Sequence, residues 1–300
     1  MASAEVFAGH YDLHAEPVAD GVWVVRGADA AIGFANGGAI ANATILAATD
    51  TDKGAILIDC GPSLAYARAL SALARRLTGG PVRRVFITHL HPDHAMGAAG
   101  FAPDQIAALP ETTRELGRDG TGFSDAMYRL LADWMKGTTL VMPGLTVAPG
   151  PMVVGGRRLT AVALAGHSDG DLALLDEATG TLITGDLVFH NRAPATPDAN
   201  LARWRDSLTT LTQIPHRRLI PGHGPVDPTD SAIAQTHDWL DWLEGALRTA
   251  VIGGLDMGEA GEIAIPPRFA DVAMARYELQ RSVVHFYPRL EAELLPRVGG

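Results

Sequence analysis

The sequence has 300 residues, of which 47% are hydrophobic, and its formal net charge is −10. This acidity, together with the lack of any basic cluster larger than arginine pairs, argues against a nucleic-acid partner. The apolar runs are short and are interrupted by charge or glycine, so we expect no membrane span. Cys60, the single cysteine, cannot form an internal disulfide. No signal peptide is evident, which favours a cytoplasmic protein, or a periplasmic one if a signal peptide has been removed.

The first half of the chain alternates strands with one clear helix. Apolar runs predict strands at 22–26, 40–47, 55–58, 84–88 and 106–109, and the second and third of these form a hairpin. Leucines and alanines at helical spacing predict a helix from Leu64 to Leu77, which Gly79-Gly80-Pro81 ends. The glycine-rich loop 27–38 carries Phe34, which either forms a flap over a pocket or packs on the domain edge. We expect Gly120 and Gly122 to break the helical segment 111–136 into two pieces.

The second half contains a further group of strands followed by helices. The patterns predict strands at 152–154, 159–164, 172–175 and 181–184, then helices at 201–211, 230–250 and 268–295, the last kinked or split at Pro288. This order predicts an α/β (α+β) fold in which helices cover the outer faces of two sheets. We expect one domain over residues 1–300, with an N-terminal lead at 1–20 and a mainly helical C-terminal part at 229–295 packed on the same domain.

A dense group of potential metal ligands follows the strand 84–88, in the segment His89-Leu90-His91-Pro92-Asp93-His94. Imidazole and carboxylate suit zinc or a similar divalent ion. Alternate residues of an extended segment point the same way, so His89 and His91 can hold one ion. Asp93 and His94, where the chain turns, can hold a second. Three later strands also end in a glycine and a ligand-type residue, namely His167, Asp186 and His223. A metal site at one rim of a sheet needs ligands from several loops that follow strands, and glycines let those loops turn sharply and approach one another.

These motifs resemble those of the metallo-β-lactamase-fold hydrolase superfamily over roughly residues 20–295. The resemblance implies an αββα sandwich and a site with two metal ions, zinc or alternatively iron or manganese. It places His89, His91 and His167 on the first ion, Asp93, His94 and His223 on the second, and Asp186 between both. It also implies that Asp59 lies beneath the site and orients the metal-binding loop. The stretches 36–42, 58–63 and 285–291 are similar to zinc metallohydrolases associated with quinoprotein dehydrogenase systems.

The resemblance favours a zinc-dependent hydrolase that acts on an ester, thioester, lactone or amide carbonyl of a small-molecule substrate. A hydroxide shared by two ions would be the nucleophile, and Asp93 would orient it and accept its proton. True β-lactamases of the commonest zinc class place a cysteine where this chain has Asp186, so β-lactam hydrolysis, weak or substantial, is the less favoured alternative. An iron-dependent redox enzyme and a non-catalytic metal-binding accessory of a quinoprotein system are the others.

Four residues are candidates for contacts with the substrate, and the chain can also form a homo-oligomer. These candidates are Phe34 in the glycine-rich loop, and His190, Arg192 and Trp204 in the segment that follows Asp186.

Overall fold

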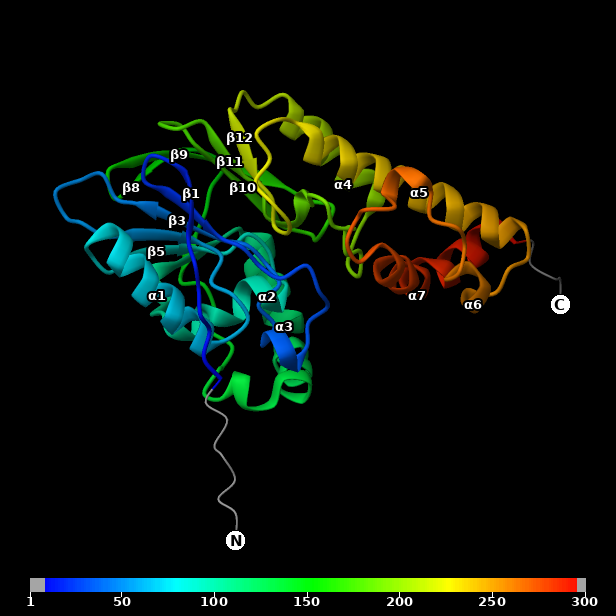
Figure 1. Cartoon of the computed structure of the whole chain (residues 1–300), viewed down its shortest axis with the longest axis horizontal. Coiled ribbons are helices and arrows are strands. Elements are labelled where there is room, and N and C mark those ends of the chain that lie inside the picture. The colour runs from blue at the N-terminus through cyan, green and yellow to red at the C-terminus, as the bar shows by residue number, and fades with distance from the viewer. Residues whose placement is uncertain (1–8, 296–300) are drawn as a thin grey trace, which may run out of the picture.

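Two β-sheets lie face to face between helices in the computed structural model, which describes residues 9–295 (Figure 1). The first sheet has the strand order β1-β2-β3-β4-β5-β6-β7, and the second has the order β12-β11-β10-β9-β8. The strands of the first sheet are β1 Glu16–Ala19, β2 Val22–Val25, β3 Ala43–Ala47, β4 Ala55–Ile58, β5 Val82–Phe86, β6 Ile106–Ala108 and β7 Leu145–Thr146. Those of the second are β8 Gly150–Val154, β9 Arg157–Leu164, β10 Asp171–Asp176, β11 Thr181–Ile183 and β12 Arg218–Ile220.

Helices cover the outer faces of both sheets and continue beyond the second sheet. In Figure 1, α1 lies below the first sheet, whereas α5, α6 and α7 extend to one side of the sandwich. The helices are α1 Leu64–Thr78, α2 Pro92–Ala95, α3 Pro110–Leu131, α4 Leu201–Thr212, α5 Ser231–Ile252, α6 Met257–Ala260 and α7 Ala275–Leu294. Within residues 9–295, none of the helices combines the length and apolarity needed to cross a bilayer.

Three hydrophobic cores separate the four layers. One core lies between the sheets and includes Ile56 of β4 and Leu172 of β10. A second contains Leu57 of β4 together with residues of α1 and α3. The alternating side chains of β4 therefore enter two different cores, which explains why this strand is apolar throughout. The third core joins the second sheet to α4, α5 and α7. The predicted αββα sandwich is thus confirmed, whereas the assignment of 1–300 to one domain stays a prediction.

The predicted strands agree with the structure to within a few residues, and β3 and β4 pair antiparallel as predicted. The sequence patterns do not predict the short strands β1 and β7. The expected break at Gly120 and Gly122 was wrong, because α3 runs without interruption from Pro110 to Leu131. Gly120 is buried, and a Cβ atom there would lie 2.8 Å from the side chain of Leu140, so glycine serves close packing at this position.

The last predicted helix also needs correction. Helix α7 begins at Ala275 rather than at 268, because Met274 adopts a left-handed conformation with φ 61°. Pro288 lies inside α7, yet the helix continues to Leu294. Proline removes one backbone hydrogen bond, but the face of α7 that carries Tyr287 and Leu290 is buried in the third core, which holds the helix together.

The carboxyl ends of several strands meet at one rim of the sandwich. Strands β4 and β5 run parallel in the first sheet, and β11 and β12 run parallel in the second, so the loops that follow each pair emerge on the same side. These loops carry Asp59, His89, Asp186 and His223. His167 joins them from the loop between β9 and β10. The fold therefore concentrates the predicted ligands from distant parts of the chain.

Candidate metal centre

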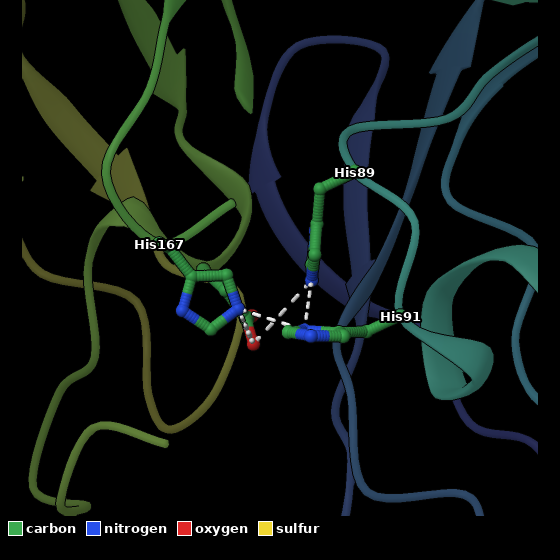
Figure 2. Close-up of side chains that lie close together, drawn as sticks. His89, His91 and His167 are labelled. Atoms are coloured by element: carbon green, nitrogen blue, oxygen red, sulfur yellow. Dashed lines mark hydrogen bonds and ion pairs between the residues drawn. The ribbon is translucent and has the colours of Figure 1, made fainter. Parts of the chain in front are cut away.

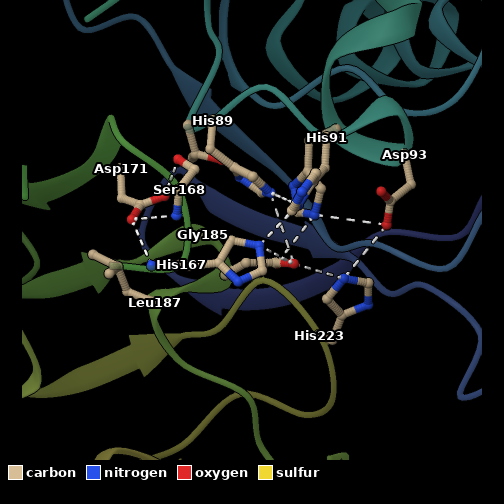
Figure 3. A network of polar contacts seen from close by, with 12 residues as sticks. His89, His91, Asp93, His167, Ser168, Asp171, Gly185, Leu187 and His223 are labelled. Carbon is tan, nitrogen blue, oxygen red and sulfur yellow. Dashed lines mark hydrogen bonds and ion pairs between the residues drawn. The ribbon is translucent and has the colours of Figure 1, made fainter. Parts of the chain in front are cut away.

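Seven buried histidine and aspartate side chains converge at the rim, and they are the seven predicted from the sequence (Figure 3). They form two groups, each with its ligand atoms within 4.8 Å of one another. Their exposure ranges from 0% for His94 and His167 to 7% for His91. The first group comprises His89, His91, His167 and Asp186, and the second comprises Asp93, His94 and His223.

The division into two groups follows from the backbone after β5. His91 is extended, with φ −64° and ψ 145°, and it is the N-cap residue of α2. Pro92 occupies the first helical position, where its fixed φ suits a helix start. Asp93 and His94 consequently lie in the first turn of α2 and face the second group, whereas His89 and His91 precede the turn and face the first.

Hydrogen bonds fix the tautomers of the two histidines in the second group. The Nδ1–H of His94 donates to Oδ2 of Asp59 at 2.7 Å, since a carboxylate can only accept. The Nδ1–H of His223 donates to the carbonyl oxygen of Ile40 at 2.8 Å. In the neutral form of each ring, which a metal ion requires, the Nε2 atom is left with a lone pair that faces the group. Asp59 thus lies behind His94 and is hydrogen-bonded to it, a position from which a carboxylate can orient a ligand.

The same logic applies to the first group. His91 donates from Nε2 to Oδ2 of Asp198 at 2.8 Å, which leaves a lone pair on Nδ1. Thr88 donates its hydroxyl to Oδ2 of Asp59 at 2.9 Å and therefore accepts from Nδ1 of His89 at 3.0 Å. The Nε2 atom of His89 then also carries a lone pair. Asp59 supports both groups, through His94 directly and through Thr88 indirectly.

Ring nitrogens of the first group approach one another closely (Figure 2). Nε2 of His89 lies 3.0 Å from Nδ1 of His91, and Nε2 of His167 lies 2.8 Å from that same Nδ1. Within residues 9–295, Nε2 of His94 and Oδ1 of Asp186 are buried without a hydrogen-bond partner, although they lie 3.1 Å apart. Converging ring nitrogens and an orphaned buried carboxylate oxygen are what a divalent cation would satisfy. Both groups can therefore hold metal ions.

Asp186 lies between the groups. Its Oδ1 is 3.1 Å from Nε2 of His94, and its Oδ2 is 3.2 Å from Nε2 of His223 and 3.4 Å from Nε2 of His167. Gly222 makes this position possible, because a Cβ atom there would lie 1.9 Å from Oδ1 of Asp186. The glycine before His223 thus serves close approach, as the recurring strand-end motif predicted.

Burial favours the neutral imidazole at His89 and His167. At His91 and His94 burial also lowers the pKa, but the nearby carboxylates, led by Asp198 at His91 and by Asp186 at His94, together raise it by more. Burial, and after it the neighbouring His91, lower the pKa of His167 to about 3. The pKa of His89 is also well below its ordinary value because of burial and the nearby His94. Burial raises the pKa of Asp186, but His223 and His94 lower it by more, so this carboxyl is ionised. Neutral histidines and a charged carboxylate are the ligand forms that bind zinc.

Two buried residues support His167 from behind. Asp171 accepts hydrogen bonds from the backbone N–H groups of His167 and Ser168, each at 3.0 Å, and it fixes the turn that carries the histidine (Figure 3). The indole of Trp204 packs edge-on against His167 with ring centroids 4.9 Å apart, and its N–H donates to the carbonyl oxygen of Leu187. Trp204 is fully buried, so the structure places this candidate substrate contact behind the ligand instead.

A cavity of about 310 Å³ opens over both groups and is lined by His91, Asp93, Asp186 and His223. Of the other sequence candidates, Arg192 lines this cavity, while Phe34 and His190 do not. His190 is hydrogen-bonded to the carbonyl oxygen of Pro225 and faces a separate depression. Phe34 is 49% exposed, and Ala31 and Ile32 are the residues of the loop 27–38 that line the cavity.

Several residues of the site were not found from the sequence. Asp198 orients His91 across 107 positions of the chain, and no local pattern marks it. Asn42 brackets His223 by donating to the carbonyl oxygens of Pro221 and Gly224, at 2.9 and 2.8 Å. The stretch 36–42 carried a resemblance that included Asn42, but its hydrogen bonds span 179 and 182 positions and required the fold.

The fold and the site define a class of proteins, namely αββα sandwiches with paired groups of metal ligands at one rim. Residues 36–223 match the family model of the metallo-beta-lactamase superfamily, and the chain belongs to this superfamily. The predicted resemblance is thereby confirmed, while the quinoprotein-associated subgroup stays a prediction. Members of this superfamily are mostly hydrolases.

Solved structures of metallo-β-lactamases share the fold. One from Pontibacter korlensis is 20% identical with a TM-score of 0.60, and the alignment covers 76% of this chain and 99% of that chain. The FIM-1 enzyme from Pseudomonas aeruginosa in its mono-zinc form is 17% identical with a TM-score of 0.59, over 77% and 96% of the two chains. A linear primary-alkylsulfatase from a Pseudomonas strain is 30% identical over 56 residues, which span 19% of this chain and 11% of that protein.

Proposed function

We propose that this protein is a dinuclear zinc-dependent hydrolase that acts on an ester, thioester, lactone or amide carbonyl of a small molecule. The observation that carries the proposal is the set of lone pairs that His89, His91, His94 and His223 turn toward two adjoining groups with Asp186 between them. Nitrogen and carboxylate donors in such a set suit zinc. Zinc ions held there would lower the pKa of water to about 7 and polarise a carbonyl.

The chain itself would supply orientation and a proton acceptor. Asp93 lines the cavity, and its Oδ2 lies 3.4 Å from Nε2 of His223, which places a carboxylate beside the reacting centre. Among the described residues that line the cavity there is no serine, threonine, cysteine or lysine. Ser168 is buried and donates to Asp171 at 2.6 Å, so it is committed elsewhere. This environment supports attack by water rather than by a side-chain nucleophile.

The substrate class is open to a direct test. Zinc content is measured by elemental analysis, and the same preparation is screened against esters, thioesters, lactones, amides, the β-lactam nitrocefin and an alkyl sulfate. We expect about two zinc ions per chain and turnover of a carbonyl substrate. One iron ion with little zinc would contradict the proposal and favour redox chemistry.

A variant separates catalysis from metal binding alone. Asp93→Asn should lower turnover by roughly 10²- to 10⁴-fold, the usual effect of losing a general base, while the first group keeps its ion. Turnover that survives this substitution unchanged would remove Asp93 from the mechanism. A complete absence of turnover in the wild-type protein, with both ions bound, would instead favour a non-catalytic accessory.

A further inference from the structure

Helix α7 forms part of the cavity wall although it lies outside the matched residues 36–223. Tyr277, Glu278 and Arg281 of α7 line the same cavity as the ligand-type residues of the rim. Glu278 is 1% exposed, whereas the side chain of Arg281 is 38% exposed. The C-terminal part of this chain thus brings charged side chains to the space in front of the candidate metal centre.

Arg281 is held in place but is only partly satisfied. Its Nη1 donates to the carboxylate of Glu278 at 3.1 and 3.4 Å, and its Cζ lies 5.5 Å from the ring centroid of Tyr277. Within residues 9–295, its Nε and Nη2 atoms make no hydrogen bond. A guanidinium offers five N–H donors in a rigid fork that matches an oxyanion. Arg281 therefore keeps donors available at the edge of the cavity.

The second arginine that lines the cavity, Arg192, is mostly engaged by the protein itself. Arg192 donates from Nη1 to the carbonyl oxygens of Ala28 and Ala30, and its Nη2 lies 3.9 Å from Glu278. Glu278 is thus shared by two arginines, and this set carries one excess positive charge. The carboxylate of Asp198 accepts from His91. Among the described residues, Arg192 keeps one buried donor, Nε, without a partner, whereas Arg281 keeps Nε and Nη2 at the exposed edge of the cavity, where an incoming ligand meets them first.

The facing wall is apolar. Four residues of α3 and Ile32 of the glycine-rich loop line it; the four are Phe123, Ala126, Met127 and Leu130. Leu130 is 54% exposed, so the apolar wall continues to the mouth of the cavity. A cavity with one apolar wall and a positioned cation is suited to a ligand that combines a hydrocarbon part with an anionic group.

We propose that Arg281 binds an anionic oxyacid group of the substrate, while the α3 wall holds its hydrocarbon part. This inference rests on the proposed hydrolase function and specifies its substrate class, a small amphiphilic anion such as the monoester or monoamide of a dicarboxylic acid. The role of Arg281 is to determine specificity, because recognition of an oxyanion by a guanidinium is charge-assisted and geometrically selective.

A matched pair of esters tests the proposal. Mono-4-nitrophenyl glutarate carries a carboxylate where 4-nitrophenyl pentanoate carries a methyl group. Arg281→Gln removes the charge, but its amide can still donate to Glu278. We expect kcat/KM for the anionic ester to fall about tenfold through KM, the effect of one charge-assisted hydrogen bond at a half-exposed site, with the neutral ester unchanged. Arg289→Gln, on the same helix but outside the cavity lining, is the matched control.

Binding to the metal-free protein provides a second readout that does not depend on turnover. By calorimetry, the monoanilide of glutaric acid should bind about tenfold more weakly to Arg281→Gln than to the wild type, and Arg281→Lys should recover part of the loss. The neutral anilide of pentanoic acid should not distinguish them. Equal losses for both ligands, no loss at all, or no preference of the wild-type protein for the anion would overturn the proposal. If neither ester is hydrolysed, ester hydrolysis fails as the function, and the anilides alone decide the role of Arg281.

Discussion

Replacement of Asp59 by asparagine should lower the metal affinity of the second group, Asp93, His94 and His223, more than that of the first. Asp59 is 3% exposed and accepts three hydrogen bonds, from the backbone N–H of Thr88 at 2.8 Å, from its hydroxyl at 2.9 Å and from Nδ1–H of His94 at 2.7 Å. Its φ is 63°, a region that asparagine also tolerates. The substitution thus preserves size and backbone conformation and changes the hydrogen-bonding character of one side-chain atom, Oδ2. The Thr88 hydroxyl, which also bonds to Oδ2, can accept from the new NH₂ group and still accept from Nδ1 of His89, so the first group is disturbed less.

The expected magnitude follows from the tautomer of His94. If the amide oxygen introduced by Asp59→Asn accepts from the backbone of Thr88, the new NH₂ group faces Nδ1 of His94, and Nδ1 must accept. The ring proton then moves to Nε2, the atom that faces Asp186 at 3.1 Å. Either His94 loses its hydrogen bond or it loses its metal-facing lone pair. Loss of such orienting partners typically costs about 10- to 100-fold in metal affinity.

Zinc affinity can be followed for both groups by competition with a chromogenic chelator, together with elemental analysis after dialysis. We expect Asp59→Asn to weaken one ion by about 10- to 100-fold and the other by much less. Asp227→Asn is the control, because Asp227 is also buried and accepts hydrogen bonds, from Thr229, Ser231 and Ala232, away from the centre. Wild-type affinity for both ions in Asp59→Asn, or equal weakening of both, would refute this reasoning.

Two further predictions concern a ligand support and pH. Asp198→Ala should lower the zinc affinity of the first group about tenfold in the same chelator assay. Asp198→Asn should lower this affinity less, because an amide oxygen still accepts the hydrogen bond from His91. Equal losses in the two variants would contradict this prediction. Tyr11→Phe removes a 2.6 Å hydrogen bond to the carbonyl oxygen of Gly37 and should cost about 1 kcal/mol at pH 8. Burial raises the pKa of Tyr11 to about 12, although the hydrogen bond with Ser63 lowers it. The difference in free energy of unfolding between the wild type and Tyr11→Phe should therefore persist below about pH 10 and shrink as pH rises toward 12. Urea unfolding of the wild type and Tyr11→Phe at pH 8 and 11 measures the difference in their free energies of unfolding. The same difference at both pH values would count against this account.

The sequence revealed the fold and the two groups of candidate ligands because both depend on local patterns. Buried strands such as β4 appear as continuous apolar runs, and the glycine before His223 marks a close approach that the structure places at Asp186. The segment from His89 to His94 predicted two groups, since Pro92 starts a helix between them. Each of these signals lies within a few residues of the feature it predicts.

What the sequence did not reveal depends on contacts between distant segments. Asp198 lies 107 positions from His91, and α7 reaches the cavity only through the packing of the third core. Trp204 was expected in the pocket, but aromatic residues near a site are as useful behind a ligand as in front of it. The break expected at Gly120 failed for the same reason, because Leu140 and the packing of α3 outweigh the low helix propensity of glycine.

The hydrogen bonds behind the ligands imply that the scaffold sets the geometry of the centre. The neutral rings of His89 and His91 direct lone pairs at each other across 3.0 Å, an arrangement that is unfavourable unless a metal ion or a proton lies between them. Each ring is fixed from behind, by Thr88 and by Asp198, and the loops that carry the rings begin at strands buried in two cores. Metal binding would therefore relieve repulsion instead of ordering flexible side chains. Such preorganisation would allow the proposed contact from α7 to alter substrate preference without disturbing the candidate ligands.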